Sequence, residues 1–383
     1  MAKQKALLIE LSSHSLVIQP WFDAILDSDK EIVVPRGVLN QISKSLIEQG
    51  ISQELLVFES FHFTRLLIKN LLFKNRKSLK VVKDSENQPA KIIVTSASEM
   101  RLPFQCYLNM ILISLVGIEI LCIRNAGRWR IKNRNILKLV RYSYNPAKNI
   151  KVILLEILAY YIERLILKRS RKLVFESHHQ MELFNHDHLK LGSKTQIVFC
   201  GRQHRSRQSM KKFVEKNYIG IGLLGTINKE KRNYFEVARA VEMLCSEGIS
   251  VRVFFLGAYL GNGSQEVLDL FGDFIEFAPS FEQSFVSEKL IEEMIQEVDV
   301  FISPMFGSHY EQGGSSGAVA DSVFWQRPLL LPAKFKSNYL QEELYFYDSI
   351  EELKSLLRNR NKLRYNAVNH VEKETLTNFL NRF

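Results

Sequence analysis

The sequence predicts an α/β protein with two domains, each built around a parallel β-sheet. A chain of 383 residues is too long for one ordinary core, and two domains of about 150 to 200 residues are the natural expectation. Short apolar runs alternate with helix-like segments, which is typical of parallel sheets. Residues 201–215 are basic and lack apolar periodicity until Phe213, as in an inter-domain linker. The predicted boundaries are 1–205 for the first domain, 206–216 for the linker and 217–357 for the second domain.

In the first domain, each expected strand is a short apolar run and each expected helix has apolar residues at helical spacing. The expected strands are 5–11, 32–34, 91–95, 118–123, 173–177 and 195–200. The expected helices are 21–26, 38–49, one from 108 into the strand at 118, 150–167 and one beginning at 180, with 51–58 as a connection.

Polar loops follow two of these strands, at the sheet edge where ligands gather. His14 follows the first strand and is a candidate for substrate contact or acid/base work, or else a loop histidine without a role. Glu99 follows the strand at 91–95 and is a candidate acceptor-side carboxylate, or else an acidic residue at a helix start.

Composition indicates a folded protein with reduced thiols. Hydrophobic residues make up 46% of the chain and charged residues 24%, which is typical of a globular protein. The four cysteines lack CxxC spacing, so we expect neither disulfides nor a zinc site. The first apolar run, residues 6–11, is too short for a signal peptide, and a cytoplasmic location is expected.

Positive charge is concentrated in the first part of the chain. Residues 1–215 contain 35 Lys and Arg against 18 Asp and Glu, a net charge of +17, whereas residues 216–383 contain 17 against 23, a net charge of −6. The amphipathic run 61–73 ends in cations, and residues 124–144 interleave cations with aromatics. Both patterns suit an anionic membrane surface, although they also suit ordinary solvated faces. No nucleic-acid motif accompanies them, so no nucleic acid is expected.

Two patterns resemble metal sites. The histidines at 178–179 and 186–188 lack ligands converging at defined spacing, and Asp27-Ser28-Asp29 has the composition of a solvated turn. We therefore expect no metal and no cofactor.

The second domain repeats the alternation of strands and helices with short links. The expected strands are 219–224, 251–257, 274–277, 298–303 and 329–331; the expected helices are 235–247, 267–271, 287–297, one beginning near 318, 350–357 and 363–383.

Two segments of this domain have the composition of an anion cradle. Gly313 to Gly317 follow a strand and open a helix with Ser315 or Ser316 as N-cap, so first-turn amides can point at a phosphate. Gly225-Thr226 follow another strand, and Lys231 and Arg232 come close behind to neutralise an anion. Asp321 lies one helical turn past the glycine loop, where a carboxylate can accept hydrogen bonds from ribose hydroxyls.

In their order and spacing, residues 219–333 resemble the donor-binding domain of GT-B nucleotide-sugar glycosyltransferases, the group 1 type in particular. The family pattern has a strand ending in Gly, a basic pair, a strand ending in Ser-Pro, a Gly-rich loop, an acidic residue and Gly-x-Pro. Here these are Gly225-Thr226, Lys231-Arg232, Ser303-Pro304, Gly313 to Gly317, Asp321 and Gln326-Arg327-Pro328. The first of two family glutamates is replaced by Gly313, and Glu311 or His309 can substitute for it.

The resemblance implies two Rossmann-like domains facing a cleft, with helix 363–383 completing the first domain. It also implies metal-independent, retaining transfer of a hexose. The donor site would comprise Gly225, Thr226, Lys231, Arg232, Gly314, Ser315, Ser316, Gly317 and Asp321. His14, Glu99 and Glu311 are the catalytic candidates.

We therefore expect a glycosyltransferase that moves a sugar from a nucleotide diphosphate-sugar to a saccharide or lipid-linked acceptor. That acceptor would be a lipid-linked or polysaccharide precursor at the cytoplasmic membrane face. A sugar-nucleotide epimerase of the same fold and a non-catalytic membrane- or nucleic-acid-binding protein remain alternatives.

Overall fold

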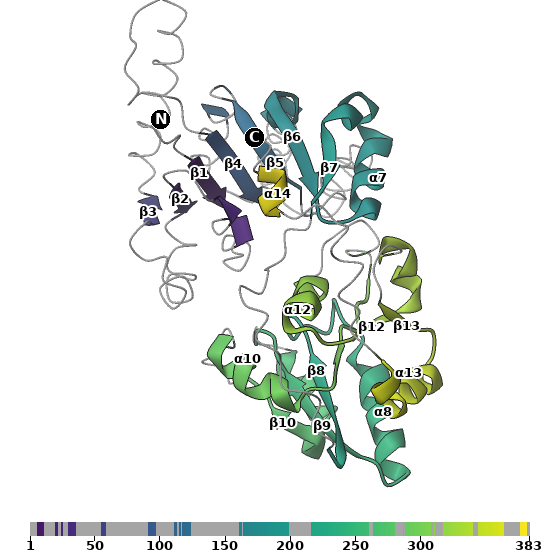
Figure 1. Ribbon diagram of the computed structural model, residues 1–383. Helices are drawn as coiled ribbons and strands as arrows, with labels where there is room; N and C mark the ends of the chain where they lie inside the picture. Colours follow the sequence, from purple (N-terminus) through teal and green to yellow (C-terminus); the bar gives the residue numbers. More distant parts are fainter. Residues whose placement is uncertain are drawn as a thin grey trace, which may run out of the picture. The chain divides into compact units, whose positions relative to one another are not determined.

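The chain forms two compact α/β units, one of residues 1–200 with 374–383 and one of residues 201–373 (Figure 1). The computed structural model describes residues 6–10, 20–21, 24–25, 30–35, 55–58, 91–96, 111–112, 115, 117–123, 161–162, 164–198, 216–259, 263–279, 286, 288–307, 310, 317–339, 344–363 and 376–380. The predicted fold class, two Rossmann-like parallel-sheet domains, is confirmed. The cleft expected between them stays a prediction.

The first unit contains a parallel sheet with strand order β3-β2-β1-β4-β5-β6-β7 among the described residues. The strands are β1 (Ala6–Glu10), β2 (Lys30–Pro35), β3 (Leu55–Phe58), β4 (Lys91–Ser96), β5 (Ile118–Cys122), β6 (Ser170–Phe175) and β7 (Thr195–Ile197). Helix α7 (His178–Asp187) follows β6, with Ser177 as its N-cap. The 3-10 helix η5 (Leu189–Lys194) leads into β7.

Two expectations for this unit were wrong. Residues 55–58 were expected to connect elements, but they form the edge strand β3, because four apolar residues suffice to pair with one neighbour. Strand β6 was expected to begin at residue 173 but begins at Ser170, so Arg171 and Lys172 belong to the strand. Their charges are compatible with the strand because Arg171 is exposed and paired with Glu119 of β5 at 2.6 Å.

The second unit contains a six-stranded parallel sheet with strand order β10-β9-β8-β11-β12-β13 among the described residues. The strands are β8 (Tyr218–Leu223), β9 (Ser250–Phe255), β10 (Ile275–Phe277), β11 (Val300–Ile302), β12 (Leu329–Pro332) and β13 (Tyr345–Tyr347). The sequence did not predict β13, whose three aromatic residues are too short a run to distinguish from a loop.

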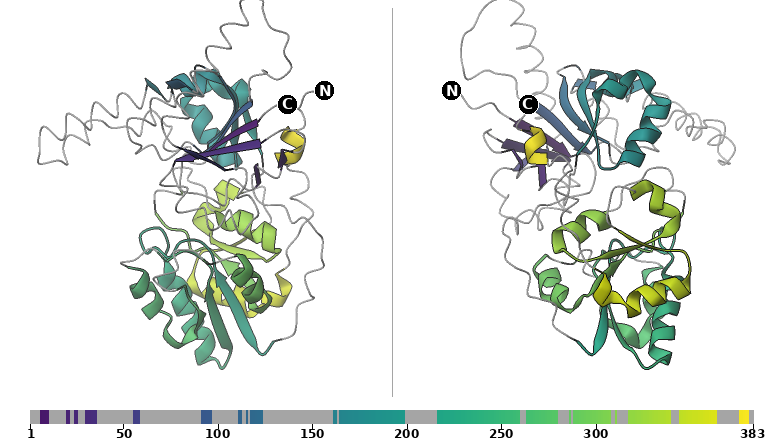
Figure 2. Two further views of the ribbon diagram at one scale, coloured as in Figure 1. Left: turned by 90° about the vertical axis from the view of Figure 1, so that its left-hand side faces the viewer. Right: turned by 45° about the vertical axis from the view of Figure 1, so that its right-hand side comes forward.

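Helices cover both faces of the second sheet (Figures 1 and 2). Helices α8 (Tyr234–Ser246), α9 (Ser264–Asp269) and α13 (Ile350–Arg358) contribute to one core, and α10 (Glu288–Met294) and α12 (Gly317–Trp325) contribute to the other. Most buried residues of α8 recur at helical spacing, namely Tyr234, Val237, Ala238, Val241 and Leu244, and Ala240 is buried beside them. Alternate residues of β11 point into opposite cores, with Val300 and Ile302 in one and Phe301 in the other.

Short 3-10 helices complete the second unit: η6 (Gly272–Phe274), η7 (Ile295–Glu297), η8 (Ala333–Tyr339) and η9 (Arg360–Lys362). Leu363 follows η9 and packs into the core of the second unit, so this unit extends past residue 357. Helix α14 (Leu376–Leu380) belongs to the first unit, where Phe379 is fully buried. All views show α14 beside the strands of the first sheet (Figures 1 and 2).

Candidate functional site

The candidate anion site lies at the carboxyl ends of β8 and β11. These neighbouring strands are the point at which the strand order reverses, because the chain passes from β8 to β9 on one side and from β11 to β12 on the other. Ligands of open parallel sheets bind in the crevice at such a switch point. Gly225, Thr226, Lys231 and Arg232 all lie in the loop that follows β8, as the sequence predicted.

Two glycines let this loop close tightly. Gly225 has a φ of +85°, and a Cβ there would lie 2.1 Å from Nη2 of Arg232. Gly257, after β9, would place a Cβ 1.8 Å from the carbonyl oxygen of Gly225. Position 225 needs glycine because its φ is positive and because a Cβ would displace the guanidinium of Arg232. Position 257 needs glycine because the two chain segments approach too closely there for a side chain.

Arg232 is a buried cation with unused hydrogen-bonding capacity. Its side chain is only 7% exposed, and Nη1 donates to the carbonyl oxygen of Thr226 at 2.7 Å. Its Nε is buried and has no hydrogen-bond partner among the residues that the structure describes. Among the described residues no carboxylate forms an ion pair with it. Because a buried charge without a counter-ion is unfavourable, Arg232 is suited to an anion that is supplied by a ligand.

Two backbone hydrogen bonds fix the position of Arg232. Asn233 donates to the carbonyl oxygen of Pro304 at 2.8 Å, and the amide of Phe306 donates to the carbonyl oxygen of Lys231 at 2.8 Å. The loops after β8 and β11 are thus joined by a short antiparallel bridge, in which Arg232 pairs with Met305.

The structure separates the side chains of the predicted basic pair. Lys231 is exposed whereas Arg232 is buried, since neighbouring residues of an extended segment point to opposite sides. Lys229, also close behind the glycine, forms an exposed ion pair with Glu266 at 2.6 Å.

Helix α12 begins at the same edge of the sheet, in the segment between β11 and β12. It starts at the exposed Gly317, and its buried residues Ala318, Val319 and Ser322 hold it against the sheet. Asp321 lies on its second turn, and its Oδ2 would be 3.9 Å from a Cβ placed at Gly317. The carboxylate of Asp321 therefore lies on the same face of α12 as Gly317, close to the first turn of the helix. First-turn amides and this carboxylate can contact a phosphate and a neighbouring hydroxyl, respectively.

Several sequence-predicted residues lie outside the described residues. These are His14, Glu99 and Glu311 as catalytic candidates, Gly314, Ser315 and Ser316 in the glycine loop, His309 and Gly313 at the family glutamate position, and Asp27 to Asp29. Their roles stay predictions.

Sequence reasoning missed the buried Tyr234 at this edge and gave no role to the buried Ser303 of the Ser303-Pro304 pair. Tyr234 donates from its hydroxyl to the carbonyl oxygen of Thr226 at 3.2 Å, and burial raises the pKa of Tyr234, which keeps it protonated. Ser303, directly after β11, is fully buried, and its Oγ has no hydrogen-bond partner within the described part of the chain. In the sequence, these residues stand out only by their positions close to strand ends and glycines.

Two of the histidines that suggested a metal site contact other side chains of α7 and of its end. Nδ1 of His178 lies 3.0 Å from Glu182 one turn along α7, and the ring of His188 stacks on Phe184 with centroids 4.4 Å apart. Among the described residues no group of three or more His, Cys, Asp or Glu side chains gathers in a metal-binding arrangement. Cys122 and Cys245 are free thiols. In the part of the chain that is described, no helix is both long and apolar enough to cross a membrane.

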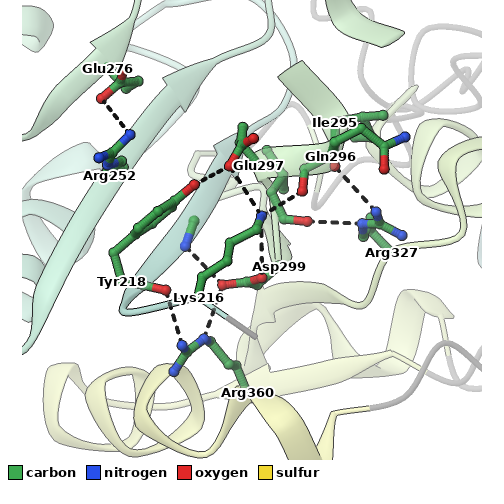
Figure 3. A network of polar contacts seen from close by, with 12 residues as sticks. Lys216, Tyr218, Arg252, Glu276, Ile295, Gln296, Glu297, Asp299, Arg327 and Arg360 are labelled. Carbon is green, nitrogen blue, oxygen red and sulfur yellow. Dashed lines mark hydrogen bonds and ion pairs between the residues drawn. The ribbon is translucent and has the colours of Figure 1, made fainter. Parts of the chain in front are cut away.

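A network of charged groups occupies the opposite, amino-terminal edge of the second sheet (Figure 3). The buried Asp299 accepts from the amide of Gly220 at 2.9 Å and from Nε of Arg360 at 3.0 Å, and Lys216 lies 3.9 Å away. Tyr218 donates to Glu297. Burial and this hydrogen bond raise the pKa of Tyr218 to about 12, and the same bond lowers the pKa of Glu297. Each carboxylate of this network has cationic or hydroxyl partners, so its role is structural.

Comparison with known proteins identifies the fold. No protein-family model and no curated protein sequence matches the chain. Among solved structures, a glycosyltransferase from Rickettsia africae matches with a TM-score of 0.54 and 13% identity, covering 100% of this chain and 97% of that one. The UDP-GlcNAc 2-epimerase of Neisseria meningitidis, solved with UDP-GlcNAc, matches with a TM-score of 0.53 and 10% identity, covering 99% of both chains.

A third match is the UDP-GlcNAc 2-epimerase of Methanocaldococcus jannaschii, solved with UDP-GlcNAc and UDP. Its TM-score is 0.50 and its identity 12%, over 99% of both chains. Likeness at such low identity shows the fold, which GT-B glycosyltransferases share with these epimerases, and leaves the reaction open.

Proposed function

We propose that the protein is a metal-independent, retaining hexosyltransferase that takes its sugar from a nucleotide diphosphate-sugar. The observation that carries the proposal is Arg232, a buried guanidinium at the switch point of a GT-B-like fold without a carboxylate partner among the described residues. Departure of the sugar leaves additional negative charge on the diphosphate, and a fixed cation stabilises this charge without a metal ion.

In this reaction the bond between the anomeric carbon and the diphosphate oxygen breaks, a bond from that carbon to the acceptor oxygen forms, and the proton of the acceptor hydroxyl passes to the departing diphosphate. Negative charge develops on the diphosphate as the first bond breaks. Arg232 would neutralise that charge from the loop after β8, and the first-turn amides of α12 would do so from the other side. Lys231 is exposed on the other side of the segment, so it would act on this anion only as a more distant positive charge. Asp321 would accept hydrogen bonds from the ribose, and Gly225 leaves room for the guanidinium.

The decisive test measures the binding of UDP, ADP, GDP and inorganic pyrophosphate by thermal shift and calorimetry, since a ligand of the folded state raises Tm. Arg232→Ala should weaken the ligand that binds best by about tenfold or more, because a hydrogen bond to a charged group contributes about 1.5 to 3 kcal/mol. Arg239→Ala is the matched control, since Arg239 is exposed on α8 and paired with Glu242 at 2.5 Å. Unchanged affinity in Arg232→Ala, or no binding by the wild-type protein, contradicts the proposal.

A sugar-nucleotide epimerase is the second candidate, because UDP-GlcNAc 2-epimerases share the fold and anion-binding chemistry does not separate the two reactions. The candidates differ in their need for an acceptor. Incubation of the enzyme with nucleotide sugars alone, followed by NMR of the sugar, discriminates between them: conversion without an acceptor favours the epimerase.

For the acceptor we propose a lipid-linked or polysaccharide precursor at the cytoplasmic membrane face, with the first unit contacting anionic lipid. The support is the net charge of +13 in the first unit, with 31 Lys and Arg against 18 Asp and Glu, and an exposed helical stripe of Tyr161, Arg164 and Lys168. The protein should sediment with phosphatidylglycerol vesicles at low salt and not with phosphatidylcholine vesicles. Equal sedimentation with both would contradict this part of the proposal, and salt-sensitive binding to RNA alone would favour the non-catalytic alternative.

A further inference from the structure

The segment that carries Arg232 has a buried side and an exposed side. Its bridge pairs Arg232 with Met305, and both of these side chains are buried. The next pair along the bridge is Lys231 and Phe306, because the amide of Phe306 donates to the carbonyl oxygen of Lys231 at 2.8 Å. Successive pairs of an antiparallel bridge point to opposite sides, and Lys231 and Phe306 are both exposed. Their side chains therefore lie together, on the side opposite to Arg232.

A second ammonium group lies at the ring of Phe306. Nζ of Lys334, in η8 after β12, is 4.7 Å from the ring centroid and covers one face of the ring. Phe306 nevertheless remains 48% exposed. The stem of Lys231 lies beside the same ring, since directly opposite residues of an antiparallel pair have Cβ atoms about 5 Å apart. We call Lys231, Phe306 and Lys334 the Phe306 patch; its members come from the loops after three different strands.

The Phe306 patch has the composition of a site for a group that is both anionic and apolar. Two ammonium groups held near one ring repel each other, and an anion between them removes this repulsion. Glu230 precedes Lys231 in the chain but does not pair with it, nor does any other carboxylate in the described part of the chain. The second unit contains 21 Lys and Arg against 23 Asp and Glu, so the patch is a local cationic area on a slightly acidic unit. An apolar group beside the anion would cover the exposed part of the ring.

We propose that the Phe306 patch binds a lipid phosphate, the anionic end of a lipid-linked acceptor. The assignment to the acceptor rests on the proposed function and adds a contact that the donor site lacks. Arg232 serves the donor on one side of the segment, and the patch serves the acceptor on the other side. The two lysines would contact the phosphate, while the ring packs against the first carbons of the lipid chain.

The test measures the binding of farnesyl phosphate by calorimetry, below the concentration at which this lipid aggregates. Inorganic phosphate and farnesol each carry one of its two groups and should bind about tenfold more weakly or less. Phe306→Ala should weaken farnesyl phosphate by about fourfold to tenfold, because the lipid loses its cover on half of a ring. Lys231→Ala should weaken it by about fivefold, because one cation is lost from the phosphate. Phe306→Leu keeps an apolar surface and should stay within about twofold of the wild-type affinity.

Two matched controls separate the patch from general effects. Leu270→Ala removes another exposed apolar side chain, and Lys362→Ala removes an exposed lysine of η9 at the amino-terminal edge of the sheet. Both variants should bind farnesyl phosphate like the wild-type protein. Phe306→Ala and Lys231→Ala should still sediment with phosphatidylglycerol vesicles, because the first unit is proposed to contact the bilayer.

Three results overturn the inference. The first is wild-type affinity for farnesyl phosphate in Phe306→Ala or in Lys231→Ala. The second is equal binding of farnesol or of inorganic phosphate by the wild-type protein. The third is loss of vesicle sedimentation in Phe306→Ala, which would make the patch a contact with the bilayer.

Failure of the inference is distinguishable from failure of the proposed function. If a nucleoside diphosphate binds through Arg232 while farnesyl phosphate binds independently of the patch, the donor site stands and only the lipid-phosphate site is rejected. If farnesyl phosphate binds as expected while UDP, ADP and GDP do not bind, the donor site is rejected and the patch stands as a lipid-phosphate site.

Discussion

Gly225 offers the sharpest test of the anion site, because one methyl group there acts directly on Arg232. A Cβ at position 225 would lie 2.1 Å from Nη2 and 2.8 Å from Cζ of the guanidinium, so Gly225→Ala must displace that group. The substitution also places alanine at a φ of +85°. The two effects have different consequences: the backbone strain lowers only stability, whereas displacement of the guanidinium lowers both stability and anion affinity.

Gly248 separates these effects. It has a φ of +81°, and a Cβ at this position would have no atom within 4 Å, so Gly248→Ala reports the backbone cost alone, about 1 to 2 kcal/mol. The entropy change of the unfolded chain is the same for both substitutions and cancels in the comparison. Gly225→Ala should lose a further ~1.5 to 3 kcal/mol, because moving Arg232 breaks its 2.7 Å hydrogen bond to Thr226.

Differential scanning calorimetry and pyrophosphate titration measure the two consequences. At about 2 to 4 °C per kcal/mol for a unit of this size, Gly225→Ala should melt roughly 3 to 12 °C below Gly248→Ala. Pyrophosphate binding should weaken in Gly225→Ala and stay at the wild-type value in Gly248→Ala. Equal melting temperatures together with wild-type binding in Gly225→Ala would refute the placement of Arg232 over this glycine.

Three further predictions concern stability. Asp299→Asn should destabilise by about 3 to 5 kcal/mol in denaturant unfolding because it leaves Arg360 without its buried counter-charge, whereas Glu266→Gln, in an exposed pair, should cost less than about 1 kcal/mol. Gln326→Gly should stabilise by about 1 kcal/mol, since Gln326 has a φ of 52°; an unchanged or lower Tm would contradict this. The pKa of Tyr218 is raised from 10.0 to about 12, so its contribution to stability is fully present below pH 10 and is lost as the pH rises toward 12. Tyr218→Phe should therefore not lose this stability between pH 10 and 12. If the unfolding midpoints of the wild-type protein and of Tyr218→Phe fall in parallel over this range, the assignment to Tyr218 is wrong.

The sheets were predictable because their central strands are buried on both faces. Strand β8 is buried along its whole length, and such a strand appears in the sequence as a continuous apolar run between turn residues. Strands β3 and β13 lie at sheet edges, where a short run with one neighbour has the same composition as a loop. Leu363 was assigned to the last helix because its apolar character shows that it is buried but not which core buries it.

The position of the loop after β8 was predictable from its residues, and its geometry was not. Glycine after a strand and a basic pair indicate an anion site, and both appear at the predicted edge. Lys231 is exposed and Arg232 is buried because of the bridge between Arg232 and Met305. These two positions are more than seventy residues apart, so no local sequence pattern encodes the contact. Gln326 shows the converse case. It stands where the family pattern has glycine, and its φ of 52° shows that the backbone keeps the conformation that glycine favours.

The two edges of the second sheet use buried charge in opposite ways, and this contrast is the physical reason for placing function at only one of them. At the amino-terminal edge, Asp299 is surrounded by an amide, a guanidinium and an ammonium group, so its charge is compensated within the protein. At the carboxyl edge, Arg232 has one carbonyl partner, a free Nε and no carboxylate among the described residues. A fold tolerates an uncompensated buried charge at a cost in stability, and a bound anion recovers that cost. Saturating pyrophosphate should therefore raise the Tm of the wild-type protein more than that of Arg232→Ala, while Asp299→Asn, although destabilised, should keep the full ligand-induced shift.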